Sequence, residues 1–326
     1  MQPISAMAVL AGFAVSAAAW SAVPPDPSLP SYPSKPIRMV TVEAGGSTDF
    51  VARLIAQGLG EALGRQVVVD NRGGASGLIA KETVARANPD GYTLLTDSSA
   101  LWILPLLRPV PYDPFTAFAP VTLADRSPGI LVLHPSVAAN SVRELIVLAK
   151  AKPAALNYST GLPGSSNHLA AELFKALAGV DLMRVNYKGA GPALTALIAG
   201  ETQVMFATSG SVASQLKSGR LKALAVTSAQ RSALAPELPT MAEAGVPGYR
   251  SESAHAVFAP AGTPPVLIAL LQREIARSLG RAEVKERLLT AGIEVVASTP
   301  AELTAAMRSE SEQLGRVVRA AGIRAE

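Results

Sequence analysis

Hydrophobic residues along this chain follow two spacings, one typical of strands and one typical of helices. Short apolar runs at 37–42, 66–70 and 92–96 predict three strands. After the first run, apolar residues recur at helical spacing at Val51, Leu54, Ile55, Leu59, Ala62 and Leu63. A second helical segment is expected at 78–87. Strands that alternate with helices in this way predict right-handed βαβ units and a parallel sheet.

A second unit of the same kind follows. Strands are expected at 156–159, 183–187, 204–207 and 221–227. Ser141 and Glu144 have the spacing of a capping box and predict a helix that reaches Lys150.

The C-terminal part is expected to be helical at 265–279 and 282–291. A last helix should begin at Thr299, where Glu302 completes a second capping box.

Two apolar segments, 129–133 and 256–264, are expected to cross between the units. The fold class is therefore expected to be α/β, with two lobes, two hinge crossings and a ligand cleft between the lobes. Lobe 1 would comprise 37–130 and 256–326, and lobe 2 would comprise 131–255.

The first 36 residues differ from the rest. An uncharged apolar run at 6–22 precedes a proline-rich stretch. This order is typical of a secretory signal peptide, predicted at 1–22, with a spacer and mature N-terminus at 23–36. Ala19 and Ala22 are the candidate last residues of the signal peptide before its cleavage site. No Lys or Arg precedes the run, so a membrane anchor and a misplaced start codon are the alternatives.

Composition narrows the possible functions. Of 326 residues, 49% are hydrophobic and 17% are charged, which allows a large core. The net charge is +4 and the basic residues are scattered, so no nucleic-acid surface is expected. The chain has no Cys and three widely spaced His. We therefore expect no disulfide, no metal site and no cofactor.

Two glycine-containing loops carry the candidate chemistry. Residues 43–49 read Glu-Ala-Gly-Gly-Ser-Thr-Asp between a strand and a helix, and 159–168 repeats this layout. A helix N-terminus offers backbone N–H groups and a partial positive charge, which suit a carboxylate or phosphate. The sequence thus predicts two helix N-termini that share one small anion, without catalysis.

Several short motifs, taken in their order along the sequence, make the chain recognisable. They lie at 44–49, 68–77, 89–95, 187–189, 224–227 and 258–264. With these motifs the chain resembles the solute-binding receptors of tripartite tricarboxylate transporters, or Bug receptors, from Tyr32 to Gly322. The resemblance implies a type II-like periplasmic binding protein. It would capture a small organic carboxylate, perform no chemistry, and deliver the ligand to membrane permease subunits. We expect a monomer in the periplasm.

Mapped onto this chain, the resemblance and the loops predict a set of ligand-binding residues. They are Glu43, Ala44, Gly45, Gly46, Ser47, Thr48, Asp49, Ser98, Ser99, Trp102, Thr160, Gly161, Pro163, Gly164, Ser165, Ser166, Lys188, Ala207 and His255. Asp49 could instead only cap its helix, Trp102 could fill the lobe surface, and Lys188 could be solvated.

Glu43 bears on the ligand's chemistry. Two like charges at ~4 Å repel by about 4 kcal/mol at an effective dielectric constant near 20. Glu43 should therefore point to solvent or face a donor on the ligand. With Trp102 and His255 near the expected cleft, this favours an amino-, amide- or ring-bearing acid.

Three other functions remain open from the sequence. The same clamp could feed a signalling system. Ser165 or Ser166 with His168 could form a periplasmic hydrolase, although no carboxylate is placed to orient the imidazole. A ligand-sensing domain of a transcription regulator would share the architecture, but the chain shows no helix-turn-helix segment.

Overall fold

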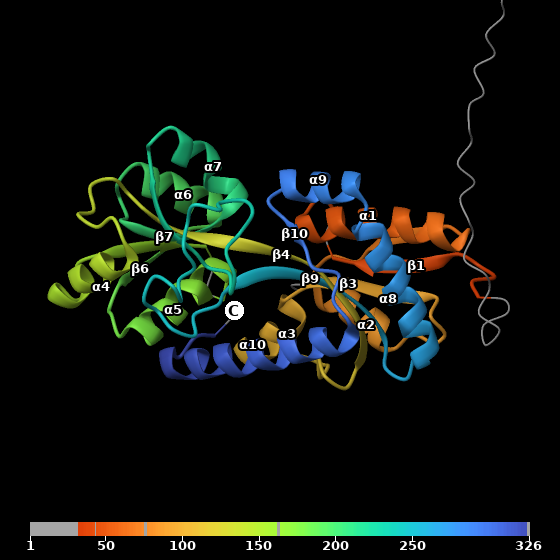
Figure 1. Ribbon diagram of the computed structural model, residues 1–326. Coiled ribbons are helices and arrows are strands. Elements are labelled where there is room, and N and C mark those ends of the chain that lie inside the picture. Colours follow the sequence, from red (N-terminus) through yellow and green to blue (C-terminus); the bar gives the residue numbers. More distant parts are fainter. Residues whose placement is uncertain (1–31, 43, 75–76, 162–163, 325–326) are drawn as a thin grey trace, which may run out of the picture. The chain divides into compact units, whose positions relative to one another are not determined.

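Ten strands form one mixed sheet in the computed structural model, which describes residues 32–42, 44–74, 77–161 and 164–324 (Figure 1). The predicted signal peptide, Glu43 and Pro163 lie outside the described residues. The order across the sheet is β2 (Val67–Asn71), β1 (Ile37–Thr41), β3 (Thr93–Ser98), β9 (Glu252–Pro260), β4 (Phe118–Leu133), β7 (Val204–Thr208), β5 (Asn157–Thr160) and β6 (Met183–Asn186). Two further strands, β8 (Lys222–Val226) and β10 (Glu294–Val295), pair with β4.

The prediction of a parallel sheet holds for each end of the sheet and is wrong for its middle. Strand β1 is parallel to β2 and β3, and β5 is parallel to β6 and β7. Strand β9 is antiparallel to β3 and β4, and β4 is antiparallel to β7 and β8. The difference arises because β4 and β9 are long strands that cross the fold in opposite directions. From Gly129 onward, β4 changes its partners from β9 to β7 and β8.

The described residues contain ten α-helices. They are α1 (Ser47–Leu63), α2 (Leu78–Ala85), α3 (Ala100–Leu107), α4 (Val142–Ala151), α5 (Ser166–Ala178), α6 (Ala190–Ile198), α7 (Ser209–Lys217), α8 (Pro265–Leu279), α9 (Ala282–Thr290) and α10 (Pro300–Ala321). The capping box predicted at α10 is confirmed. At α4 only half of the predicted box forms: Ser141 caps the N–H of Glu144, but the Glu144 carboxylate accepts from the N–H of Asn140 instead of that of Ser141. Helices α3 and α7 were not predicted from the sequence. Helix α3 is apolar on nearly every side and contains Pro105, so it lacks the 3.6-residue pattern.

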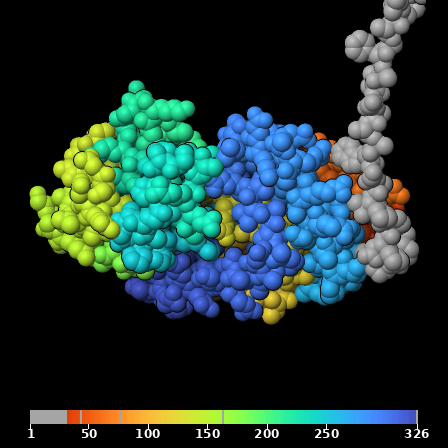
Figure 2. Space-filling view, in the orientation of Figure 1, coloured from red at the N-terminus to blue at the C-terminus, as the bar shows by residue number. Residues whose placement is uncertain are grey.

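Helix α10 links distant parts of the sheet. It packs against α3, which follows β3, and against α5, which follows β5. Figure 2 shows it in dark blue, running beneath segments of several colours. Its apolar residues Leu314 and Val318 share one cluster with Leu107 of α3 and Leu169 of α5. Helices α3 and α5, which begin beside the predicted ligand residues Ser99 and Ser165, therefore rest on a common support.

Hydrophobic residues elsewhere form separate clusters on the two halves of the sheet. One surrounds Leu95, Trp102 and Phe258, and another surrounds Tyr158, Phe174 and Phe206. None of the described helices is both long and apolar enough to cross a membrane.

Candidate functional site

A cavity of about 290 Å³ collects residues from four distant chain segments. They are the start of α1, the junction of β3 and α3, the start of α5, and strand β9. The lining comprises Ser47, Thr48, Ser98, Ser99, Ala100, Ile103, Leu104, Leu107, Gly164, Ser166, Leu169, Ser253 and His255. Its volume lies near the lower end of the range for ligand sites, roughly 300–1,000 Å³. That size suits a small acid.

Two larger hollows have other surroundings. One of about 740 Å³ lies between α3 and the end of α10, and one of about 630 Å³ lies beside Arg126 and Glu294. Neither contains a residue of the predicted ligand loops. The smaller cavity is therefore the better candidate site.

Three helices begin at this cavity. Ser47 is the first residue of α1, Ala100 the first of α3 and Ser166 the first of α5. Their N-cap residues, Gly46, Ser99 and Ser165, make no side-chain capping hydrogen bond. At α3, the Ala100 N–H donates to Ser98 Oγ at 3.3 Å and the Trp102 N–H donates to the Ser99 carbonyl at 3.2 Å. Because the first N–H groups of a helix have no intrahelical acceptor, the starts of α1 and α5 are the ends best able to donate to an anion in the cavity.

A chain of hydrogen-bonding groups leads from the cavity into the sheet. Ser47 Oγ lies 3.1 Å from His255 Nε2, and His255 Nδ1 lies 2.7 Å from Asp125 Oδ1. His255 is 3% exposed and Asp125 is fully buried. Burial opposes the charged imidazolium, but the charge and hydrogen bond of Asp125, helped by Asp97, outweigh it. The pKa of His255 is therefore raised above 6.5.

A second buried carboxylate supports the cavity at β3. Asp97 Oδ1 accepts the N–H of Ser98 at 2.7 Å, and Lys81 Nζ lies 2.7 Å from Asp97 Oδ2. Both side chains are 1% exposed. This ion pair fixes the backbone at the point where Ser98 and Ser99 enter the cavity.

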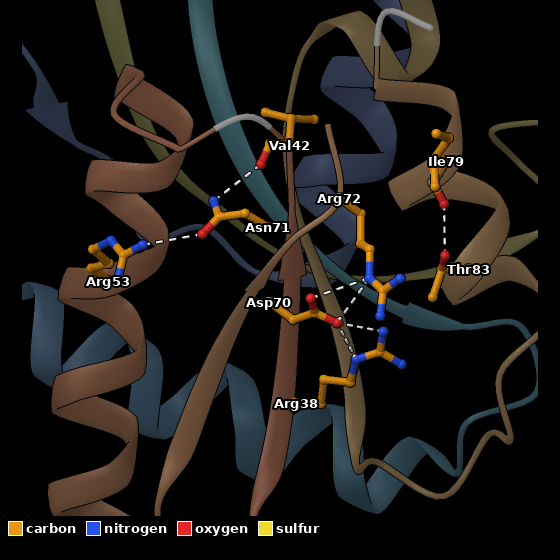
Figure 3. Close-up of polar contacts among 8 residues, drawn as sticks. All are labelled: Arg38, Val42, Arg53, Asp70, Asn71, Arg72, Ile79 and Thr83. Atoms are coloured by element: carbon orange, nitrogen blue, oxygen red, sulfur yellow. Dashed lines mark hydrogen bonds and ion pairs between the residues drawn. The ribbon is translucent and has the colours of Figure 1, made fainter. Parts of the chain in front are cut away.

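The glycine loop before α1 is held by Asp49 and Asn71. Asp49 Oδ2 accepts the N–H of Gly45 at 2.9 Å and also pairs with Arg53. The Asn71 amide nitrogen donates to the carbonyl of Val42 at 3.0 Å, and its oxygen accepts from Arg53 (Figure 3). The same amide nitrogen also donates to Asp49 Oδ1 at 2.9 Å. The end of β2 thus fixes the loop that leads from β1 to Ser47.

The adjacent loop after β2 is anchored by charge. Asp70 pairs with Arg38 and Arg72 (Figure 3). Gly77 has a φ of 76°, and an added Cβ would lie 2.7 Å from a Val42 methyl group. Only glycine fits there, so Gly77 has a structural role beside the site.

Histidine 168 fixes the loop before α5. Its ring is buried, its Nδ1 accepts the N–H of Gly164 at 3.0 Å, and Arg184 lies 2.8 Å from Nε2. Burial and the charge of Arg184 lower the pKa of His168 to about 4. The ring is neutral at neutral pH and holds Gly164 at the cavity wall.

One known family matches most of this chain. Residues 51–323 match the model described as "Tripartite tricarboxylate transporter family receptor". The chain belongs to this receptor family. The receptor is 36% identical over 299 residues to Protein BugT of Bordetella pertussis, covering 90% of this chain and 92% of the relative.

Solved structures agree. Rpa4515 of R. palustris, solved with adipate, is 36% identical, with a TM-score of 0.71 over 90% of this chain and 99% of the other. MatC from Rhodopseudomonas palustris, with bound malate, is 29% identical, with a TM-score of 0.67 over 88% of this chain and 100% of the other. The neighbours are two-lobed periplasmic binding proteins, so the expected fold class is confirmed. Family and neighbours are receptors, and the chain is accordingly a binding protein rather than an enzyme.

The structure brings together seven residues of the predicted site from both loops and from β3 and β9. Those that line the receptor's cavity are Ser47, Thr48, Ser98, Ser99, Gly164, Ser166 and His255. Ala207 lines a neighbouring space of about 30 Å³ that shares Ser166 and Ser253 with the cavity. That space has room for about one water.

Other predicted site residues lie around the cavity or support it. Asp49 ties the loop down, and Thr160 Oγ1 contacts Ser165 Oγ at 3.3 Å. Ala44, Gly45 and Gly46 are exposed, Gly161 is buried beside Gly189, and Lys188 is exposed. The cavity lining contains none of these residues.

Trp102 departs most clearly from its predicted position. It is 2% exposed, it packs in the cluster with Phe258, and its Nε1 donates to Glu310 at 2.8 Å. On α3, Trp102 faces the core, whereas Ile103 and Leu104 face the cavity. Trp102 is therefore corrected to a core residue.

Sequence reasoning missed the apolar wall, Ser253 and Asp125. Strand alternation could have found Ser253, which lies two residues before His255 and shares its face of β9. Asp125 is separated from His255 by 130 residues and required the antiparallel register of β4 and β9.

Replacing Asn71 with Ala should destabilise the receptor by about 1–3 kcal/mol, because the Val42 carbonyl and the Asp49 carboxylate lose a donor. Thermal unfolding measures this loss. Gln57→Ala is the matched control, since it removes only an exposed hydrogen bond to Glu61. Equal melting temperatures for the two variants would contradict the anchoring role of Asn71.

Proposed function

We propose that this receptor captures one small organic carboxylate in the 290 Å³ cavity and hands it unaltered to a tripartite tricarboxylate-type permease. The supporting observation is the convergence of three helix N-termini and the Ser47–His255 pair on one cavity. Rpa4515 and MatC hold adipate and malate, which are carboxylates of suitable size.

The lobes follow from the same proposal. Lobe 1 comprises 37–130 and 256–326, lobe 2 comprises 131–255, and the cavity draws on both. The change of partners along β4 at Gly129 supports this division. Hinge bending at β4 and β9 would then open and close the cavity.

In this mechanism the carboxylate lies at the starts of α1 and α5. A protonated His255 donates from Nε2 to Ser47 Oγ, which leaves the Ser47 hydroxyl hydrogen free for the ligand. Asp125 holds the ring in that orientation and supports its charge.

The order Ser47–His255–Asp125 resembles that of serine hydrolases. There, however, the neutral imidazole removes the serine proton. The raised pKa of His255 favours the opposite direction of hydrogen bonding. The earlier hydrolase hypothesis drew on Ser165, Ser166 and His168, but His168 Nδ1 is engaged by Gly164.

A bound carboxylate at ~100 times its dissociation constant should stabilise the receptor by about 2.7 kcal/mol. For a chain of this size the melting temperature rises by a few degrees. A thermal-shift screen of organic acids, followed by mass spectrometry of the recovered ligand, makes the test. A hydrolysed product that disappears in Ser47→Ala would contradict the receptor function.

Export is the second part of the proposal. Residues 1–22 would be removed near Ala19 or Ala22, so that the mature receptor works in the periplasm, as a monomer. N-terminal sequencing of protein recovered from the periplasm should begin after one of these residues. Recovery of the full-length chain from the cytosol would contradict export.

The clamp also suits a signalling receptor. Ligand-dependent uptake that stops on deletion of the permease genes would favour transport, whereas a ligand response that survives the deletion would favour sensing.

A further inference from the structure

The cavity has two chemically different sides. Serines, threonine and His255 form one side, and the other is a continuous apolar wall of Ile103, Leu104, Leu107 and Leu169. On α3, the spacing of 103, 104 and 107 places these residues on one helical face. The polar and apolar sides therefore face different parts of a bound molecule.

The apolar wall is supported from behind. Leu107 and Leu169 pack with Leu314 and Val318 of α10, and Ile103 contacts the same cluster. A wall backed by a third helix keeps its shape, because packed side chains in a core leave little free volume. The wall is thus a fixed surface.

Charge sets a limit on the ligand. Among the described residues that line the cavity there is no Lys, Arg, Asp or Glu, and His255 is the single titratable group. One carboxylate can be received at the helix ends. A second carboxylate pressed against leucine and isoleucine side chains would lose its water without gaining a partner, which is costly.

We propose that the ligand is a monocarboxylic acid with an apolar body, whose carboxylate meets Ser47 and Ser166 and whose alkyl or aryl part lies on the α3–α5 wall. This inference rests on the proposed carboxylate-receptor function and adds the class of acid. It retains the ring-bearing acids expected from the sequence and does not require an amino or amide group.

Calorimetry with a homologous series tests the wall. Propanoate, butanoate, pentanoate and hexanoate share one carboxylate and differ in methylene groups. Affinity should rise about fourfold per methylene, which corresponds to about 0.8 kcal/mol at 1.4 kcal/mol per factor of ten. Adipate matches hexanoate in chain length and adds a second carboxylate. It should bind at least about tenfold more weakly than hexanoate.

Two variants on α3 separate the contribution of the apolar wall to binding from any general effect of changing this helix. Ile103 and Leu106 are both partly buried and both contact the α10 cluster, but only Ile103 lines the cavity. Ile103→Asn should weaken hexanoate binding about tenfold and reduce the gain in affinity per methylene group. Leu106→Asn should leave the hexanoate affinity and the gain per methylene group unchanged.

The outcomes separate the two proposals. Tight adipate or malate binding with weak hexanoate binding would overturn the apolar-acid inference and leave the carboxylate receptor standing. The inference would also be overturned if affinity did not rise with chain length from propanoate to hexanoate, or if Ile103→Asn and Leu106→Asn weakened hexanoate binding equally. Failure of every acid to bind the folded receptor would overturn both.

Discussion

Carboxylate affinity is expected to fall by about ten- to hundredfold as the pH rises from below 6.5 through the raised pKa of His255. Below that value the imidazolium donates to Ser47, and Ser47 donates to the ligand. Above it the neutral ring keeps its proton on Nδ1 for Asp125 and accepts the Ser47 hydrogen at Nε2. The ligand then loses a donor, while its own carboxylate stays ionised throughout.

The groups that face His255 come from four elements. Asp125 of β4 and Ser47 of α1 contact the ring, and Asp97 of β3, paired with Lys81 of α2, adds a more distant charge. In the free receptor, protonation of His255 stabilises the fold below pH 6.5. This contribution is lost as the pH rises through the raised pKa.

Calorimetry across this pH range measures the effect. His255→Gln should give weak, pH-independent binding. Glu310→Gln is the control for titration elsewhere. Burial raises the pKa of Glu310 to about 7, so it titrates in a similar range, but it contacts Trp102 behind the cavity and not the ligand site. A pH dependence that persists in His255→Gln and vanishes in Glu310→Gln would show that the wrong group had been assigned.

The largest effect on stability is expected from Lys81→Met, which leaves Asp97 buried without its counter-ion. Breaking a buried pair costs about 3–5 kcal/mol, so the melting temperature should drop by roughly 6–10 °C. Changing Asp97→Asn in the same chain should recover part of the loss, because the amide oxygen still accepts from Ser98.

Arg86→Met is the matched control for this loss. It breaks an exposed ion pair with Glu82 on the same helix and should cost less than about 1 kcal/mol. If the Arg86→Met and Lys81→Met variants have the same melting temperature, the buried ion pair contributes no more to stability than a surface pair.

The two glycine loops were predictable because their signal is local. Gly45, Gly46 and Ser47 occupy a strand-to-helix turn that can be read from six residues, and the same holds for Gly164 and Ser166. Most strands and helices were predictable for a similar reason, since their apolar residues repeat at 2 or 3.6 positions.

The chemistry behind the loops was not predictable from local patterns. Helix α3 has no apolar stripe, so neither its existence nor the division between core-facing Trp102 and cavity-facing Ile103 could be read from the sequence. The contact of Asp125 with His255 depends on a register shift between β4 and β9. Long-range strand pairing of this kind leaves no mark on either segment alone.

The central claim is that one acid binds between the starts of α1, α3 and α5. Calorimetry with hexanoate on the wild type, Ser47→Trp and Ser309→Trp tests it most directly. Ser47 is exposed and lines the cavity, whereas Ser309 is exposed on α10 outside it. We predict one hexanoate per chain for the wild type and Ser309→Trp, and at least about a hundredfold loss for Ser47→Trp. Unchanged binding by a folded Ser47→Trp receptor would contradict the account.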